Sequence, residues 1–440
     1  MMKLRYKSLF RAGIFLITAC LLSCKSGSFN VFKTASLHEL YERKLVTSGL
    51  DQTAMGKAWI YLADQSIAKA VQIKIPYREK GYFTAEKVQA AAFIFNMDRG
   101  QKLLIKLNKK PVDGFRVYVD VWEKEQGGDL KFIVSSDSTG NVVQSDIKSS
   151  GSYIIRLQPE LLAGGEYTLE ITSGPSLAYP LKTYQNNQVR SFFGDGRDSD
   201  TRKHEGIDIF SAFRTPVLAI APGTVTRVNE SNLGGKVVWV RPHDRDFTLY
   251  YAHLDEQTVS DGQAVQIGDT LGRMGNTGNA RTTPPHLHFG VYTREGAVDP
   301  LPFINPKVKE LPEDRIETNA VNMIMRTSGN ASLSGILGED PVTLKNGTIL
   351  RISAVSESSF RVEMPDSRLG YLPKNRVLSI AKPLLQYKID QDQQELYDRP
   401  DSLAAVKMNL KAGQKVQVLG NFGDYQFVLD SNKETGWILK

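Results

Sequence analysis

The stretch His286-Leu287-His288-Phe289 decides how the central part of this 440-residue chain is interpreted. Alternate residues of a strand project to the same side, about 7 Å apart along the chain, so His286 and His288 are expected to face one way. Two shorter stretches supply matching residue types, and these are His204-Glu205-Gly206-Ile207-Asp208 and Tyr251-Ala252-His253-Leu254. Four of the chain's six histidines therefore lie in these three stretches, His204 and His288 being the first and last residues of an 85-residue segment.

The spacing within these stretches is typical of a metal site. His204 and Asp208 stand four residues apart, which puts them on one face of either a helix or a strand, and Gly206 with the β-branched Ile207 favours the strand. Two histidines and one carboxylate make the three-ligand set of a catalytic zinc, which keeps one position open. Zinc lowers the pKa of its water to about 7. The two histidines that remain can serve as a general base and as a transition-state donor.

Residues 190–305 resemble the lysostaphin-type zinc endopeptidases of peptidase family M23. The resemblance covers about a quarter of the chain and is carried by the three stretches above together with TPVLAIAPGTV (215–225), GNTG (275–278) and VDP (298–300). It implies a central, β-rich peptidase domain over residues 181–305 that binds one Zn²⁺ ion.

The same resemblance assigns roles to five side chains. It makes His204, Asp208 and His288 the zinc ligands. It makes His286 the general base and His253 the residue that stabilises the tetrahedral intermediate. The sequence leaves open which of these two histidines removes the proton from water.

The expected activity is zinc-dependent hydrolysis of peptide cross-links in bacterial peptidoglycan. The alternative is a non-catalytic M23-like regulator that activates other cell-wall hydrolases; lost metal ligands would indicate it, and here all five positions are intact. A structural zinc site in an interaction protein would leave His253 and His286 unexplained.

Nucleic acid is not expected as a partner, because residues 190–305 hold 12 basic and 14 acidic residues. The sequence carries no signal for an oligomeric state.

The fold expected for the whole chain is mainly β and multidomain. Residues 24–180 begin with a helical segment, since Ser36 and Glu39 have the spacing of a capping box. Alternating strands such as Leu103/Ile105/Leu107 follow and predict a β-sandwich. No catalytic residue types gather there, so this region is interpreted as a spacer or binding module. His38 and His243 are both assigned to the surface.

The C-terminal part of the chain repeats itself at an offset of 66 residues. Leu344-Lys345-Asn346-Gly347 recurs as Leu410-Lys411-Ala412-Gly413, and Gly370-Tyr371-Leu372 recurs as Gly436-Trp437-Ile438. These units resemble bacterial SH3-like domains, which predicts two small barrels at residues 321–380 and 385–440. Their aromatic residues either fill the barrel cores or bind peptide or cell wall. Linkers are expected at residues 173–195 and 302–320.

Residues 1–23 are interpreted as a lipoprotein signal peptide. The apolar run at residues 12–22 has 11 residues, whereas a membrane span needs roughly 20. The run ends in Leu21-Leu22-Ser23-Cys24, which resembles a lipobox, so Cys24 is the expected lipid attachment and Cys20 the weaker choice. A plain signal peptide with an incidental cysteine is the other interpretation. The lipobox implies export across the inner membrane and lipid anchoring in the cell envelope. Because Lys25 stands where inner-membrane retention calls for Asp, we expect the outer membrane, facing the periplasm.

Charge and cysteine usage support this interpretation of the N-terminus. The formal charge of +7 includes four basic residues that all precede the apolar run, Lys3, Arg5, Lys7 and Arg11. Without them 51 basic residues face 48 acidic ones, so the basic character belongs largely to targeting. Modification at Cys24 would also leave the mature chain without a free thiol, and hence without a disulfide or a cysteine ligand.

Overall fold

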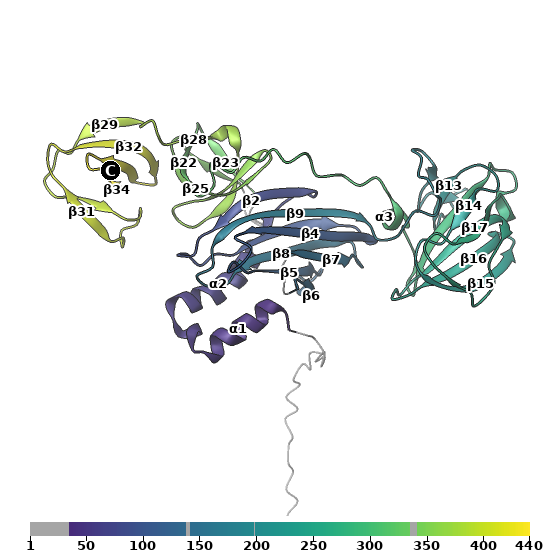
Figure 1. Ribbon diagram of the computed structural model, residues 1–440. Coiled ribbons are helices and arrows are strands. Elements are labelled where there is room, and N and C mark those ends of the chain that lie inside the picture. The colour runs from purple at the N-terminus through teal and green to yellow at the C-terminus, as the bar shows by residue number, and fades with distance from the viewer. Residues whose placement is uncertain (1–34, 138–140, 198, 335–340) are drawn as a thin grey trace, which may run out of the picture. The chain divides into compact units, whose positions relative to one another are not determined.

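The computed structural model describes residues 35–137, 141–197, 199–334 and 341–440, and these are mainly β, as the sequence predicts (Figure 1). The signal peptide and Cys24 lie outside the described residues, so the lipid attachment stays a prediction. Within the described residues, no helix is both long enough and apolar enough to cross a membrane.

Two helices open the described chain, α1 (Leu37–Thr47) and α2 (Ala54–Ala68), with the short turn η1 (Leu50–Gln52) between them. The capping box is confirmed, since the Ser36 hydroxyl accepts from the Glu39 N–H and the Glu39 carboxylate accepts from the Ser36 N–H, each at 3.2 Å. The chain turns at Gly49, whose φ of 71° is left-handed and favours glycine. Trp59 and Ala63, which share one face of α2, are both buried.

The placement of His38 on the surface was wrong. His38 is 2 % exposed, and its ring stacks on Trp59 with centroids 4.4 Å apart. Its Nε2–H donates to the Gln158 side-chain oxygen at 2.7 Å, and Gln158 in turn donates to the Trp59 carbonyl. The residue follows the helix cap, where exposure is usual, but α1 lies against β5 and carries His38 into the protein.

Burial gives His38 a measurable effect on acid stability. Burial, and secondarily the charge of Arg156, lower the pKa of His38 to about 3, although the hydrogen bond that His38 donates to Gln158 raises it. The unfolded chain therefore binds one proton more than the folded chain between about pH 6.5 and 3. The free energy of unfolding is therefore not reduced by His38 above about pH 6.5. Below that value it falls with decreasing pH, by about 1.4 kcal/mol per pH unit at most.

We expect His38→Gln to flatten the loss of unfolding free energy between pH 6.5 and 4, because glutamine can donate the same hydrogen bond without titrating. Urea unfolding at several pH values measures this slope. His243→Gln is the matched control, since His243 is exposed. Equal slopes for His38→Gln and His243→Gln would contradict the assignment.

Two sheets enclose the core of the N-terminal domain (residues 36–175). Alternating apolar residues, among them Phe93, Ile105, Ile155 and Leu169, are buried between the sheets. One sheet has the order β1 (Val71–Gln72), β3 (Ala91–Met97), β8 (Gly151–Pro159), β5 (Val117–Lys124), β6 (Leu130–Ser135). The other contains β2 (Tyr77–Phe83), β9 (Gly165–Pro175), β4 (Gln101–Lys110), β7 (Val142–Asp146).

The second of these sheets continues into the C-terminal part of the chain. Strand β2 pairs with β25 (Ile349–Ser356), with Lys80 opposite Val355, so one sheet runs through both regions. Behind this junction, Glu79 and Arg361 form a buried ion pair at 3.3 Å between carboxylate and guanidinium, with side chains 0 % and 5 % exposed. Glu79 also accepts from the hydroxyls of Tyr77 and Tyr167, each at 2.7 Å. The charged pair therefore links two segments that are far apart in sequence.

The two C-terminal repeats have equivalent strands, which confirms the internal repeat. Each member of the pairs β25/β32, β26/β33 and β27/β34 lies at the predicted offset, and the same β-bulge recurs at Ile352/Ala354 and Val418/Gly420. The first repeat comprises β22 (Ile324–Thr327), β23 (Ala331–Leu333), β24 (Val342–Leu344), β25, β26 (Ser359–Glu363), β27 (Leu369–Pro373), η3 (Lys374–Arg376), β28 (Val377–Ser379). The second comprises β29 (Leu385–Lys388), β30 (Gln394–Tyr397), β31 (Val406–Leu410), β32 (Lys415–Phe422), β33 (Tyr425–Asp430), β34 (Thr435–Leu439).

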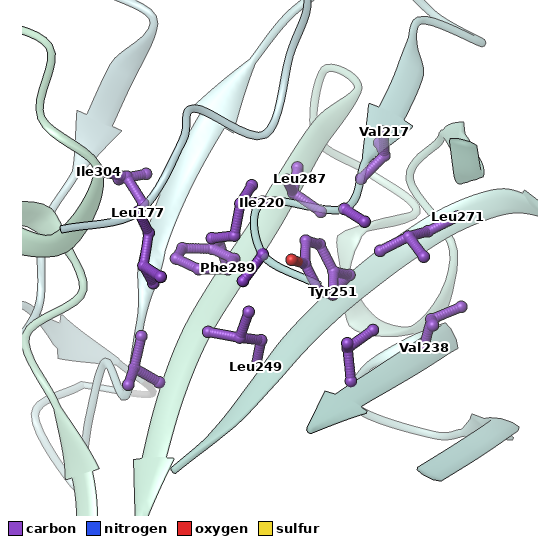
Figure 2. Close-up of a cluster of buried hydrophobic side chains, with 14 of the residues drawn as sticks. Leu177, Val217, Ile220, Val238, Leu249, Tyr251, Leu271, Leu287, Phe289 and Ile304 are labelled. Atoms are coloured by element: carbon purple, nitrogen blue, oxygen red, sulfur yellow. The ribbon is translucent and has the colours of Figure 1, made fainter. Parts of the chain in front are cut away.

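The central domain (residues 177–305) is built on a sheet in the order β10-β13-β20-β17-β16-β15-β18. Its core is a cluster in which Leu249 and Tyr251 on β17 lie beside Leu287 and Phe289 on β20 (Figure 2). The elements are β10 (Val189–Ser191), β11 (Gly196–Arg197), β12 (Arg202–Lys203), β13 (Ile207–Phe210), β14 (Pro216–Leu218), β15 (Gly223–Ser231), β16 (Gly235–Pro242), β17 (Thr248–Gln257), β18 (Ala264–Val265), β19 (Thr270–Met274), η2 (Gly278–Ala280), β20 (His286–Thr293), β21 (Gly296–Val298), α3 (Leu301–Ile304).

The first and last residues of the central domain lie next to each other in space. The Leu177 N–H donates to the Phe303 carbonyl at 2.9 Å, so entry and exit are hydrogen-bonded to each other. Leu177 and Ile304 both belong to the core of this domain (Figure 2). The central domain is thus inserted between the N-terminal domain and the repeat that shares its sheet.

Candidate functional site

Strand pairing brings the predicted stretches together on one face of the central sheet. In the antiparallel pair β13–β20, Asp208 lies directly opposite His288, and Phe210 lies opposite His286. Side chains of a strand alternate between faces, so these four point to the same side. The intervening Ile207 and Ile209 are 0 % exposed in the core beneath, as are Leu287 and Phe289. The i, i+2 spacing therefore holds both histidines above an apolar layer.

A β-bulge brings His253 to the same face. Regular alternation from Tyr251, which is in the core, would point residue 253 into the core as well. Instead two residues of β17 oppose one of β16 between the pairs Tyr251–Val238 and Leu254–Lys236, and His253 has a left-handed φ of 63°. The extra residue returns Leu254 to the core and leaves His253 facing the site. Its ring centroid lies 5.0 Å from that of His286 and 5.8 Å from that of His288.

His204, Asp208 and His288 form a compact group of three potential metal ligands, with their ligand atoms within 4.8 Å of one another. The Nε2 atom of His204 lies 2.9 Å from Nδ1 of His288 and 3.1 Å from Oδ1 of Asp208. Nδ1 of His288 lies 3.1 Å from the same carboxylate oxygen. Within the described residues this is the group of histidine and acidic side chains whose geometry is compatible with a metal ion.

Backbone carbonyls fix the orientation of three of the imidazoles. In His204, His253 and His286 the Nδ1–H donates, at 2.9 Å in each case, to the carbonyls of Phe192, Thr277 and Pro284 respectively. The opposite nitrogen, Nε2, is thereby left without a proton in the neutral ring. Such hydrogen bonds from the outer ring nitrogen are how proteins set the tautomer of a ligating or catalytic histidine.

The electrostatics of the cluster favour an ionised carboxylate beside neutral imidazoles. Burial raises the pKa of Asp208, but the close contacts with His204 and His288 lower it by more, and the net pKa lies well below its usual range. Burial lowers the pKa of His253 to about 4, helped by the nearby His286 and His288. Burial likewise lowers the pKa of His288. A carboxylate and neutral imidazoles are the protonation states that bind metal.

Sequence reasoning missed Arg197. Its Nη2 donates to Oδ2 of Asp208 at 2.8 Å and to the Ser191 hydroxyl at 2.6 Å. Ser191 lies on the edge strand β10, opposite Asp208 in the register. This strand falls inside residues 173–195, which were interpreted as a linker; in fact residues 189–191 complete the sheet at the site. Arg197 sits on the short hairpin β11–β12, and no periodicity or motif in that polar stretch indicated it.

The position of Gly206, between His204 and Asp208, has no room for a side chain. A Cβ atom at this position would lie 2.6 Å from the Phe289 carbonyl oxygen and 2.7 Å from Nε2 of His288. Real Cβ atoms do not approach backbone so closely, so a larger residue here would displace a ligand strand. Glycine is required between His204 and Asp208 for β13 to lie against β20.

With the geometry established, comparisons with known proteins identify the domain. The model of peptidase family M23 matches residues 202–300. The L-Ala–D-Glu endopeptidase of Bacillus subtilis is 32 % identical over 139 residues, which are 29 % of this chain and 42 % of that protein. The peptidoglycan DD-endopeptidase ShyC of Vibrio cholerae is 33 % identical over 26 % of this chain and 24 % of its own length.

A solved structure is similar to a comparable share of the chain. The catalytic domain of lysostaphin from Staphylococcus simulans is 31 % identical, and the match covers 27 % of this chain and 92 % of that one, with a TM-score of 0.25. The chain spans less than half the length of the curated relatives named above. The residues that the family model matches, 202–300, hold the five clustered side chains. Residues 202–300 therefore carry the peptidase family M23 domain that the family model describes.

Proposed function

We propose that the protein is a zinc-dependent endopeptidase that hydrolyses peptide cross-links of bacterial peptidoglycan. The observation that carries this proposal is the gathering of His204, Asp208, His253, His286 and His288 on one sheet face. The relative from Vibrio cholerae that is named a peptidoglycan DD-endopeptidase supports the substrate class. Three of these side chains form the potential metal-ligand group. The other two, His253 and His286, lie beside it and are not part of it.

The donor set fits zinc. Ligand atoms about 2.0 to 2.2 Å from a tetrahedral Zn²⁺ lie about 3.3 to 3.6 Å from one another, and the three separations here, 2.9, 3.1 and 3.1 Å, are a few tenths of an ångström shorter. His204 through Nε2, Asp208 through Oδ1 and His288 through Nδ1 would hold the ion. Bound there, zinc would polarise the scissile carbonyl and lower the pKa of its water to about 7.

The remaining histidines would handle the proton and the developing charge. His286 presents an unprotonated Nε2, 4.0 Å from Oδ1 of Asp208, and would accept the proton of the attacking water as general base. His253 presents its own Nε2 to the same space and would stabilise the oxyanion once that nitrogen carries a proton. Because both rings have the same tautomer, either could take the first proton.

The placement of the enzyme in the cell is part of the proposal. Lipid attachment at Cys24 would anchor the protein in the cell envelope, at the outer membrane facing the periplasm. Stable anchoring generally needs more than one acyl chain, which a lipobox cysteine would receive. The two C-terminal repeats, as SH3-like modules, would fill their cores with aromatic residues or bind wall peptides. Such an arrangement suits work on a polymer at limited distance from a membrane.

Mass spectrometry of products from a defined cross-linked muropeptide tests the proposed activity. The purified, zinc-loaded chain should release the two stem peptides, and a chelator should stop release until zinc is returned. A chain that binds zinc but cuts no muropeptide or wall preparation would instead be the regulator of other hydrolases. The intact set of five side chains favours the enzyme.

We expect Arg197→Met to weaken zinc binding about 10- to 100-fold, because Arg197 orients Asp208 through the oxygen that faces away from the other ligands. Competition with a chromophoric chelator measures the dissociation constant. Arg294→Met is the matched control, since Arg294 is exposed in the turn after β20. Zinc affinities of Arg197→Met and Arg294→Met that equal the wild-type value would remove Arg197 from the site.

A further inference from the structure

A second arginine stands at the edge of the site, with no acidic partner among the described residues. Arg190 lies on the edge strand β10, between Val189 and Ser191. The pairing of β10 with β13 shifts its register between these two residues. Its guanidinium carbon lies 5.2 Å from the ring centre of Phe210. The Phe210 ring in turn stacks on His286 at 4.8 Å, with planes 27° apart. The order across the sheet edge is therefore arginine, phenylalanine, histidine.

The position of Arg190 suits contact with a bound peptide. The two stacking distances keep its guanidinium within a few residues of extended peptide from His286, at about 3.5 Å per residue. The side chain is exposed, so a ligand could reach it without burying an unpaired charge. The face of Phe210 holds the planar guanidinium at a defined place, as cation–π contacts do.

The hydrogen bonds of Arg190 distinguish it from its neighbour. Arg197 is committed to Asp208 and Ser191. Arg190 donates through Nε to the Asn187 carbonyl at 3.3 Å, and no carboxylate among the described residues lies within ion-pair distance of it. Its terminal nitrogens form a fork that matches a carboxylate in bidentate geometry. Residues 190–305 hold slightly more acidic than basic residues, so this is a local charge and no part of a basic surface.

We propose that Arg190 binds a carboxylate of the substrate and so makes the site selective for acidic peptides. This inference rests on the proposed peptidase function and specifies its substrate: a peptide with a free carboxylate a few residues from the scissile bond. Arg190 is a specificity residue in this scheme and takes no part in proton transfer. Phe210 positions the guanidinium on one side and contacts His286 on the other.

Two cross-linked peptides that differ only in charge test the proposal, one with free carboxylates and one with the same groups amidated. The zinc-loaded full chain should show a kcat/KM about tenfold or more higher for the acidic peptide, the size of a charge-assisted hydrogen bond. Arg190→Gln should bring this ratio close to one, chiefly through a higher KM for the acidic peptide. Arg190→Lys should restore part of the ratio, and the control Arg294→Gln should keep it.

Each other outcome overturns a stated part of the scheme. A wild-type chain that cleaves both peptides equally well would overturn the role of Arg190 while the proposed function stands. If Arg190→Gln lowered kcat equally for both peptides, Arg190 would act through Phe210 and His286 and would not select substrate. If the wild-type chain cleaved neither peptide, the proposed function would fall, and the inference with it.

Discussion

His286→Ala is expected to slow cross-link hydrolysis by about 10² to 10⁴-fold, the usual contribution of a positioned general base. Zinc binding should persist, because the ligand group consists of His204, Asp208 and His288. The measurements are product release from a cross-linked muropeptide and zinc content of the same preparation. Loss of hydrolysis with retained zinc would separate proton transfer from metal binding.

The matched control for this variant is His243→Ala. His243 is exposed in the turn after β16, as the sequence predicts, and should have no effect on either measurement. His286→Ala hydrolysing as fast as His243→Ala would refute the general-base role. Loss of zinc together with activity would instead show that His286 supports the metal site itself.

Arg361→Met is expected to lower the free energy of unfolding by about 3 to 5 kcal/mol, because it leaves the Glu79 carboxylate buried without its counter-charge. Glu79 is 0 % exposed, and the hydroxyls of Tyr77 and Tyr167 already donate to it. Burial lowers the pKa of Arg361, but the charge of Glu79 raises it by more, so Arg361 stays charged in the protein. Urea unfolding of the full chain measures the loss.

A surface ion pair in the same repeat provides the comparison. Arg368 pairs with Asp366 at 2.7 Å, with both side chains 37 % exposed, and Arg368→Met should cost about 1 kcal/mol or less. Adding Glu79→Gln to Arg361→Met should recover part of the loss, since no charge then remains buried. Equal effects of Arg361→Met and Arg368→Met would show that the buried pair contributes little to folding.

The sequence predicted which residues form the site better than it predicted how strand pairing brings them together. His286 and His288 were expected to share a face because the period of a strand is fixed, and the spacing of His204 and Asp208 followed from the same geometry. The direction in which the His253 side chain points depends on one extra residue in β17. That residue is extra only relative to the pairing of β17 with β16. No local pattern around Tyr251-Ala252-His253 records that partner. Arg197 was missed for a related reason, since its hairpin is too short to show periodicity.

Long-range packing also limited the interpretation of the other regions. The capping box at Ser36 is local and was predicted, whereas the burial of His38 against Trp59 and Gln158 depends on a strand about 120 residues away. The repeat at an offset of 66 residues was visible because both copies carry the same turn residues. The pairing of β2 with β25 had no counterpart in the sequence, since each strand alone reads as an ordinary amphipathic strand.

The inserted position of the central domain sets an order of events during synthesis. Strand β2 and its carboxylate at Glu79 leave the ribosome about 280 residues before β25 and Arg361, which at ~5–20 residues per second is a delay on the order of 15 to 60 seconds. Throughout this interval one edge of the N-terminal sheet has no partner strand. The central domain can close on itself meanwhile, since Leu177 and Phe303 are already hydrogen-bonded neighbours. A later-made strand thus completes an earlier-made sheet, and a nascent chain released before β25 is made would carry an open strand edge beside an unpaired charge.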